Sequence, residues 1–339
     1  MTETTLRSPV LVLTCNRVGH FKNLVQSLGK CVGASETEIY IAIDGPYDPS
    51  VKQANDEILR HSESLTGFSN VHILGRSTNV GPNTNLRLAV DEIFRDHDTL
   101  ILLEDDNIVA MNFLLYMNAT LSTFGHNPRC FSVCGYNLPV ARPQRCSTDI
   151  YCSPLVNAWG IGLFRDRYYR TDLEARKRLS TFFLNPLNLA KVHSLSPPFF
   201  SLFVHMFMSQ QEFADAIFTA HTLRHGMFNI YPVDTKVMNT GLDGSGIHCA
   251  NDSRFFLHDE FCNAEQASFA LEIDEEVNEH FISHNAQYVR TAFSHKLRRS
   301  IYSYLLYVLC LLVGRDTTVR LRNSAKSGLR KLGIRSDSA

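Results

Sequence analysis

The residues that decide the fold run from Leu100 to Phe113 and read LILLEDDNIVAMNF. Four apolar residues, typical of a buried strand, lead directly into three consecutive carboxylates, Glu104, Asp105 and Asp106, before apolar residues return. Two like charges about 4 Å apart repel by roughly 4 kcal/mol at an effective dielectric constant near 20. A compensating cation is therefore expected, and a divalent metal ion is the first candidate. The alternative is an acidic turn in open solvent.

The chain before this stretch alternates short apolar runs with helix-like segments. Strands are predicted at 9–14, 38–44, 70–75 and 99–105. Helices are predicted at 18–31, after the second strand in a polar segment that ends near residue 61, and at 85–94. This alternation indicates βαβ units and hence an α/β fold with a mainly parallel sheet. Ligands bind such sheets beyond the carboxyl ends of the strands. The polar residues at those ends are Thr14 and Arg17, then Asp44, and then the three carboxylates.

The second half of the sequence is less regular. The pattern predicts helices at 111–124 and 210–225, strand-like segments at 130–136 and 228–237, and a glycine-flanked apolar turn at 157–164. We expect one continuous catalytic domain over residues 1–290, with a nucleotide-sugar half at about 8–110 and an acceptor half at about 111–290. Residues 291–339 form a separate amphipathic helical tail.

The composition is typical of a soluble globular enzyme, with 339 residues, 44% hydrophobic and 20% charged. Nine cysteines without a CxxC pair indicate buried thiols in a reducing cytosol. A zinc site from cysteines 130, 134, 146 and 152 is the alternative, although its spacing is unlike common zinc knuckles. The first residues lack a signal-peptide pattern, which predicts a cytoplasmic protein.

The tail joins an apolar run to basic residues. Residues 301–313 are nearly all apolar but are too few to span a bilayer, which takes about 20 residues in a helix. Residues 296–335 contain ten Lys or Arg and one acidic residue, Asp316. A basic segment on an acidic body indicates an anionic partner, and the apolar run favours a membrane surface over nucleic acid. The alternative is a helix packed on the core or in a homodimer interface.

Several of these features resemble one enzyme family. LVLTCNR in the first strand, a second strand ending at Asp44, and LLEDD before a helix resemble GT-A glycosyltransferases of the family 2 type and of the N-acetylglucosaminyltransferase I type. The similarity covers roughly residues 8–250, with Glu104-Asp105-Asp106 as a variant of the DxD motif. It implies a Rossmann-like GT-A fold, a nucleotide-diphosphate sugar donor (a UDP-sugar is favoured), and Mn²⁺ or Mg²⁺ as cofactor.

The resemblance also implies roles for single residues of the donor site. Asp106 corresponds to the metal ligand, Asp105 to a residue near the ribose, and Glu104 to a catalytic residue near the donor sugar. Arg17 corresponds to a residue that contacts the nucleotide, and Asp44 to one that hydrogen-bonds the base. The alternatives are a surface charge at a helix start for Arg17 and an ordinary Asp-Gly turn for Asp44.

A third part of the donor site is expected in segment 77–94. The sequence STNVGPNTNLRLAVDEIF resembles the NxGxxxxN region of family 2 enzymes, although Asn79, Gly81 and Asn85 are spaced differently. Gly81 permits close backbone approach, and Asn85 is able to donate to a phosphate or sugar. An ordinary loop before a helix is the alternative.

The catalytic base is expected in the helix predicted at 210–225. Family 2 enzymes carry an Asp eleven positions before a glycine, and Asp215 stands in that relation to Gly226. The resemblance therefore implies that Asp215 deprotonates the acceptor hydroxyl, with Glu212 as the second candidate. A solvated helix carboxylate is the alternative.

Two glycine-containing segments complete the expected site. AWGIGLF (158–164) resembles the loop that lines the donor sugar and acceptor, which implies roles for Trp159 and Gly160. NTGLDGSGIHC (239–249) resembles a segment whose histidine lies near the diphosphate or metal, which implies that role for His248. A core aromatic residue and a structural histidine are the respective alternatives.

The leading hypothesis is a metal-dependent, inverting hexosyl- or N-acetylhexosaminyltransferase. Its acceptor is expected to be a glycan or lipid-linked glycan at the inner face of the cell membrane, as in surface polysaccharide biosynthesis. A nucleotidyltransferase is the first alternative, but TCNRVGHFKNL lacks the glycine-rich phosphate loop that such an enzyme needs. A catalytically silent membrane-associated binding protein is the second.

Overall fold

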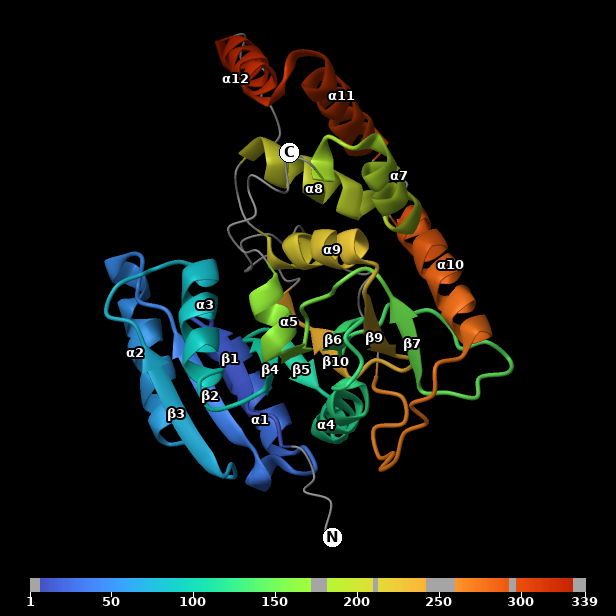
Figure 1. Ribbon diagram of the computed structural model, residues 1–339. Coiled ribbons are helices and arrows are strands. Elements are labelled where there is room, and N and C mark those ends of the chain that lie inside the picture. The colour runs from blue at the N-terminus through green and yellow to red at the C-terminus, as the bar shows by residue number, and fades with distance from the viewer. Residues whose placement is uncertain (1–6, 172–181, 210–212, 242–259, 293–296, 332–339) are drawn as a thin grey trace. The chain divides into compact units, whose positions relative to one another are not determined.

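The structure is a computed structural model that describes residues 7–171, 182–209, 213–241, 260–292 and 297–331 (Figure 1). The chain divides into two compact units, the first made of Met1–Thr171 and His221–Phe281 and the second of Asp172–Ala220 and Ile282–Ala339. The predicted tail from residue 291 lies within the second unit. Its boundary as a separate domain stays a prediction.

The first unit is built around an eight-stranded sheet with the strand order β3-β2-β1-β4-β8-β6-β9-β7. Its first four strands are β1 (Val10–Thr14), β2 (Glu38–Ile43), β3 (Asn70–Gly75) and β4 (Thr99–Glu104). They are mutually parallel, because β1 pairs with β2 on one side and with β4 on the other, and β2 pairs with β3. The predicted α/β fold with flanking helices and a mainly parallel sheet is confirmed.

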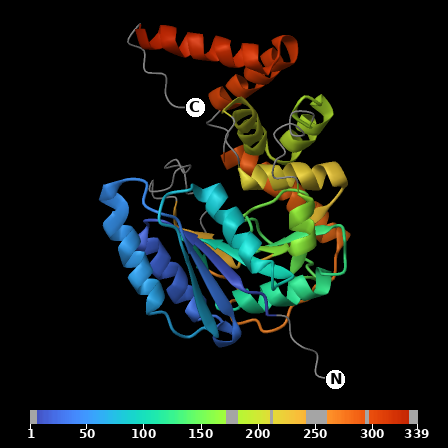
Figure 2. The same cartoon turned by 60° about the vertical axis from the view of Figure 1, so that its left-hand side comes forward.

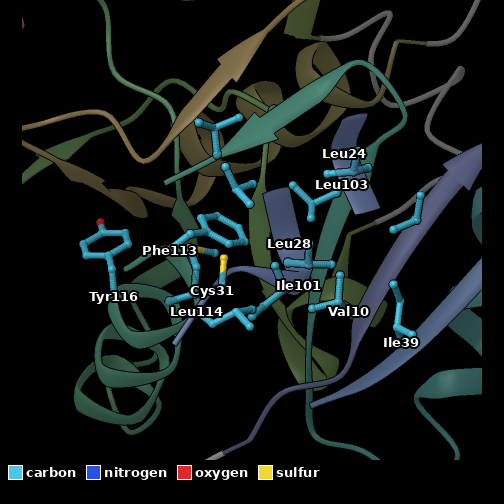
Figure 3. Packing of buried hydrophobic residues seen from close by; sticks show 14 of the residues in the cluster. Val10, Leu24, Leu28, Cys31, Ile39, Ile101, Leu103, Phe113, Leu114 and Tyr116 are labelled. Atoms are coloured by element: carbon cyan, nitrogen blue, oxygen red, sulfur yellow. The ribbon is translucent and has the colours of Figure 1, made fainter. Parts of the chain in front are cut away.

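The crossovers between these strands are helical. They are α1 (Val18–Gly29), α2 (Lys52–Glu63) and α3 (Pro82–Ile93), with short 3₁₀ helices η1 (Ala34–Glu36) and η2 (Pro49–Val51) beside them. Helix α1 buries Phe21, Leu24, Val25 and Leu28, which have the i, i+3, i+4, i+7 spacing of one helix face. Figure 3 shows Leu24 and Leu28 beside Leu103 and Ile101 of β4. This packing fixes the start of α1, and hence Arg17, next to the end of β4.

The other half of the sheet mixes directions. It contains β6 (Cys130–Cys134), β7 (Ile150–Ser153), β8 (Ile161–Phe164) and β9 (Phe228–Pro232). Strand β8 runs antiparallel between β4 and β6, where the sequence predicts a turn. The glycine that suggested a turn is required by packing instead. A Cβ at Gly162 would lie 3.0 Å from side-chain atoms of Leu121 and Met117 in helix α4 (Phe113–Phe124). The glycine therefore marks a strand pressed against a helix.

A second, two-stranded sheet joins distant parts of the first unit. Strand β5 (Asn107–Val109) pairs antiparallel with β10 (Val237–Asn239), and Asn107 stands opposite Asn239. The predicted extended segment at 228–237 is thus two strands, because the chain leaves the large sheet after Pro232. Helix α5 (Arg165–Arg170) follows β8. None of the eight described cysteines forms a disulfide.

The second unit consists of helices. It contains α7 (Pro186–Leu195), α8 (Pro197–Ser209), α11 (Leu297–Val313) and α12 (Arg315–Lys331). Helices α9 (Ala214–His225) and α10 (Glu275–Ala292) each have residues in both units. Phe183, Phe200 and Phe203 are buried within this unit, and Figure 2 shows the chain turning sharply between α11 and α12. Among the described helices, none has the length and apolarity needed to cross a membrane.

Candidate functional site

The carboxyl ends of β1 and β4 bring the predicted polar residues together. Leu13 stands opposite Glu104 in the parallel register of these strands, so the residues that follow both strands meet at one edge of the sheet. The Thr14 hydroxyl donates to Oδ2 of Asp105 at 2.9 Å. Strands β2 and β3 lie on one side of β1 and β4 lies on the other, so this edge is the switch point at which open α/β sheets bind ligands.

Arg17 bridges the two aspartates at this edge. Its Nη1 donates to Oδ2 of Asp106 at 2.7 Å, and its Nη2 donates to Oδ1 of Asp105. Asp105 and Asp106 are only 3% and 4% exposed, so the acidic turn in open solvent is wrong as an interpretation. In this structure the guanidinium of Arg17 is the cation that offsets the repulsion between the carboxylates.

Burial and charge act in opposite directions in this cluster. Burial raises the pKa of the Asp105 carboxyl above its ordinary value, although Arg17 and the hydroxyl of Thr14 oppose the rise. For Arg17, burial acts to lower the pKa, but the two carboxylates outweigh it and the pKa is raised. Arg17 therefore stays charged, and its charge opposes the rise that burial causes in the pKa of Asp105.

Asp106 is also held by a segment far along the chain. Its Oδ1 accepts hydrogen bonds from Nδ2 of Asn239 at 3.0 Å and from Nδ2 of Asn107 at 3.2 Å. Its backbone carbonyl accepts from the N–H of Thr240 at 2.8 Å. Gly241 lies so close that a Cβ there would be 2.1 Å from Oδ2 of Asp106. Both carboxylate oxygens of Asp106 are thus engaged.

Sequence reasoning missed Asn107, Asn239, Thr240 and Gly241 as parts of the site. The available signal was the glycine-containing segment 239–249, from which only His248 is singled out by resemblance. Its first three residues are the ones that contact Asp106 or stand against it. His248 itself, like Glu212, lies outside the described residues.

Asp44 is surrounded by donors from the polypeptide itself. Its Oδ1 accepts from the N–H groups of Gly45 and Val80, and its Oδ2 from the N–H of Gly81 and from Nδ2 of Asn79, all at 2.9–3.0 Å. The carboxylate is 4% exposed. Asp44 therefore fixes the loop at 79–81 against the end of β2, and its contact with a base stays a prediction.

The same loop leads into α3 through Gly81, whose φ of +83° favours glycine. Asn85 is buried, with Oδ1 accepting from Nε of Arg76 at 3.2 Å and Nδ2 donating to the carbonyl of Ala42 at 3.1 Å. The side chain of Asn85 thus ties α3 to β2. Its donation to a phosphate or sugar stays a prediction.

The segment of Trp159 and Gly160 lies against β10, the strand whose last residue, Asn239, donates a hydrogen bond to Asp106. The Trp159 ring packs edge-on against Tyr136 with the ring centres 4.7 Å apart. Gly160 has a φ of +68°, and a Cβ there would lie 2.6 Å from Cγ2 of Val237 in β10. Because β10 ends at Asn239, this contact links the glycine-aromatic segment to the carboxylate cluster. A direct role of either residue in sugar binding stays a prediction.

Two further predicted site residues lie at the end of β4 and in α9. Glu104 ends β4 half-buried, and its backbone N–H donates to Oδ1 of Asn107 at 3.1 Å. Asp215 lies in the first turn of α9, in the second compact unit. Its assignment to the same site as Asp106 therefore stays a prediction.

The described residues contain no group of three or more His, Cys, Asp or Glu side chains arranged to hold a metal ion. Asp105 and Asp106 nevertheless supply the hard carboxylate oxygens that Mn²⁺ and Mg²⁺ prefer. The two oxygens that face Arg17 become metal ligands only when the guanidinium gives them up. The donor set thus fits a divalent ion on the condition that Arg17 moves.

Neither a family model nor a curated protein matches the sequence. Among solved structures, S. aureus TarS 1–349 is similar with a TM-score of 0.40 and 14% identity, over 96% of this chain and 85% of that one. A mannosyltransferase from Pyrobaculum calidifontis, in complex with GDP-Man and Mn²⁺, gives a TM-score of 0.33 and 13% identity over 50% and 48%. Mouse xyloside xylosyltransferase 1 in its apo form gives a TM-score of 0.36 and 11% identity, over 65% of this chain and 83% of that one. Three other structures of S. aureus TarS also match, one in complex with UDP and one with UDP-GlcNAc. In these three, the match spans only 30–42% of the TarS chain.

Proposed function

We propose that this chain is a metal-dependent, inverting glycosyltransferase of the GT-A type that uses a nucleotide-diphosphate sugar. One observation carries the proposal: Arg17 bridges Asp105 and Asp106 at the switch point between β1 and β4. This edge is where open α/β sheets bind nucleotides. It presents a cation suited to a diphosphate and carboxylates suited to a ribose or a metal ion.

The proposed reaction is a single displacement at the anomeric carbon of the donor sugar. The acceptor hydroxyl forms the new C–O bond, while the bond from the sugar to the diphosphate breaks and its electron pair remains on the phosphate oxygen. The hydroxyl proton passes to the Asp215 carboxylate, and a single displacement inverts the configuration. Asp215 stands in the first turn of α9, where the helix dipole stabilises a carboxylate.

In this scheme Arg17 has two successive partners. It neutralises Asp105 and Asp106 before the donor binds, as the hydrogen bonds describe. When the donor binds, the guanidinium turns from the carboxylates to the diphosphate, where it stabilises the charge of the leaving group. Asp106, held by Asn239 and Asn107, keeps its orientation while its other partner leaves.

The proposed cofactor is Mn²⁺ or Mg²⁺, which Asp106 and His248 would hold, while Asp105 is proposed to lie near the ribose. When bound, such an ion supplies further positive charge beside the leaving diphosphate. Glu104 and Trp159–Gly160 are proposed to border the donor sugar. Asp44, Asn79, Gly81 and Asn85 are proposed to border the nucleotide, which the loop anchored on Asp44 supports.

The proposed donor is a UDP-sugar carrying a hexose or an N-acetylhexosamine. The proposed acceptor is a glycan or a lipid-linked glycan at the inner face of the cell membrane, in surface polysaccharide biosynthesis. The basic and apolar character of residues 296–335 supports a site of action at a membrane.

The test is nucleotide release from UDP-, GDP- and dTDP-sugars with Mn²⁺ or Mg²⁺, alongside calorimetric binding of each nucleotide. We expect Asp106→Asn to abolish metal-stimulated release. The matched control is Asp56→Asn, which removes an exposed carboxylate on α2 paired with Lys52 and should leave release unchanged. Absence of binding by every nucleotide, or wild-type release by Asp106→Asn, would refute the proposal.

The base assignment needs a separate variant. Asp215→Asn should bind the donor with unchanged affinity and lose transfer to an acceptor, because only proton removal is affected. Transfer at the wild-type rate would exclude Asp215 and direct attention to Glu212.

A further inference from the structure

Helix α11 uses one of its faces to pack within the second unit. Ser303 and Cys310, two turns apart, are 6% and 2% exposed. The ring of Tyr304 stacks on that of Phe200 in α8, with the ring centres 4.4 Å apart. The buried Ser303–Cys310 face and the flanking ring of Tyr304 account for the attachment of α11 to α8.

The opposite face of α11 is also apolar, but it is exposed. Ile301, Leu305, Val308 and Leu312 are 49%, 63%, 49% and 75% exposed, and we call these four residues the outer stripe. Their spacing of i, i+4, i+7 and i+11 places them along one side of the helix. A helix that only packs on its own protein carries polar residues there, so the outer stripe indicates an interaction surface.

The sequence on both sides of the outer stripe is rich in basic residues. Beyond α11 the chain passes through Gly314, with φ +79°, into α12. Helix α12 has six Lys or Arg and one acidic residue, Asp316, and its Arg320 is exposed. Two further arginines stand in the first turn of α11, at positions 298 and 299.

We propose that the outer stripe and α12 bind the surface of a membrane that contains anionic phospholipid. The aliphatic side chains of the stripe enter the boundary between headgroups and acyl chains, and the basic residues contact lipid phosphates. A second copy of this chain fits less well, because it would bring two strongly basic segments together. Nucleic acid would satisfy the charges but leave the outer stripe in water.

The test is co-sedimentation of the full chain with vesicles. Vesicles of phosphatidylcholine mixed with phosphatidylglycerol should bind the protein, binding should fall as salt is added, and vesicles of phosphatidylcholine alone should bind much less. Leu305→Glu/Leu312→Glu should reduce binding to the mixed vesicles by about tenfold or more. The matched control is Leu187→Glu on α7, where the leucine is 79% exposed but outside the stripe.

A second measurement guards against misfolding of the double variant. Leu312→Trp preserves an apolar side chain, and its fluorescence should shift to shorter wavelength when mixed vesicles are added. No shift, equal binding by the double variant and the wild type, or no binding to mixed vesicles would overturn the proposal. A wild-type dimer that becomes a monomer in the double variant, without vesicle binding, would overturn it in favour of a second copy.

Discussion

Arg17→Met is the sharpest test of the carboxylate cluster. Methionine retains an apolar stem of similar reach but removes the charge that bridges Asp105 and Asp106. Both carboxylates are only 3–4% exposed in the folded chain, so the substitution removes the counter-ion of two buried groups. Removing one partner of a buried ion pair costs about 3–5 kcal/mol. Because the Arg17 side chain is 22% exposed, we expect the lower end, about 3 kcal/mol.

The cost should depend on pH with a definite sign. Burial already holds the pKa of Asp105 above its ordinary value, and loss of Arg17, which lowers it, raises it further. A carboxyl whose pKa is higher in the folded state takes up protons on folding. Its stabilising contribution is present below the unfolded pKa, about 4, and is lost as the pH rises through the folded pKa. The penalty of Arg17→Met should therefore be largest at neutral pH and shrink towards about pH 4.

The assay is urea unfolding followed by the fluorescence of Trp159, the only tryptophan, which lies in the first unit. The matched control is Lys22→Met, which removes a cation in the first turns of α1 from an exposed pair with Glu57 and should change the unfolding free energy little. Equal losses for the two variants at neutral pH would refute the reasoning. So would a loss for Arg17→Met that is the same at both pH values.

Two further substitutions probe the surroundings of the cluster. Gly241→Ala should weaken nucleotide binding at least tenfold in calorimetry, because the added Cβ would lie 2.1 Å from Oδ2 of Asp106. The matched control is Gly19→Ala, where an added Cβ would meet no atom within 4 Å, and it should bind as the wild type does. Equal binding by both would contradict this account of Gly241. Asp44→Asn should cost about 1–3 kcal/mol and speed hydrogen exchange at the amides of Val80 and Gly81, since one amide nitrogen replaces an accepting oxygen. Unchanged exchange there would show that the loop is held by other contacts.

The parallel half of the fold was predictable because its signals are local. The runs at 9–14, 38–44, 70–75 and 99–105 are apolar, short and followed by helical periodicity, and the strands agree with them within one residue. Their register then placed Thr14 and Asp105 at one edge without further information. Position in a parallel sheet is a consequence of the strand pattern alone.

The rest depends on contacts that no local pattern reveals. Strands β5 and β10 have three residues each, too few to show a period, yet they bring Asn239 to Asp106. The segment that became β8 reads as a turn because its glycines serve helix packing. The sequence also did not reveal which cation neutralises the carboxylates. A metal ion was expected there, but Arg17, which is far from Asp106 in the sequence, provides the positive charge. That pairing appears only once the strands are in place.

The hydrogen bond between Asn239 and Asp106 also bears on how the protein is made. These residues are 133 positions apart, and β5 has no partner strand until β10 is available. During synthesis the first four strands are complete when residue 104 leaves the ribosome, long before residue 239. We therefore expect the nascent sheet to carry a cluster in which Asp106 has Arg17 and Asn107 as partners but lacks the amide of Asn239. Because long-range contacts form late, the cluster acquires its final geometry only after β10 has been synthesised, and we expect a chain truncated before β10 to hold Asp106 less firmly although its four parallel strands are present.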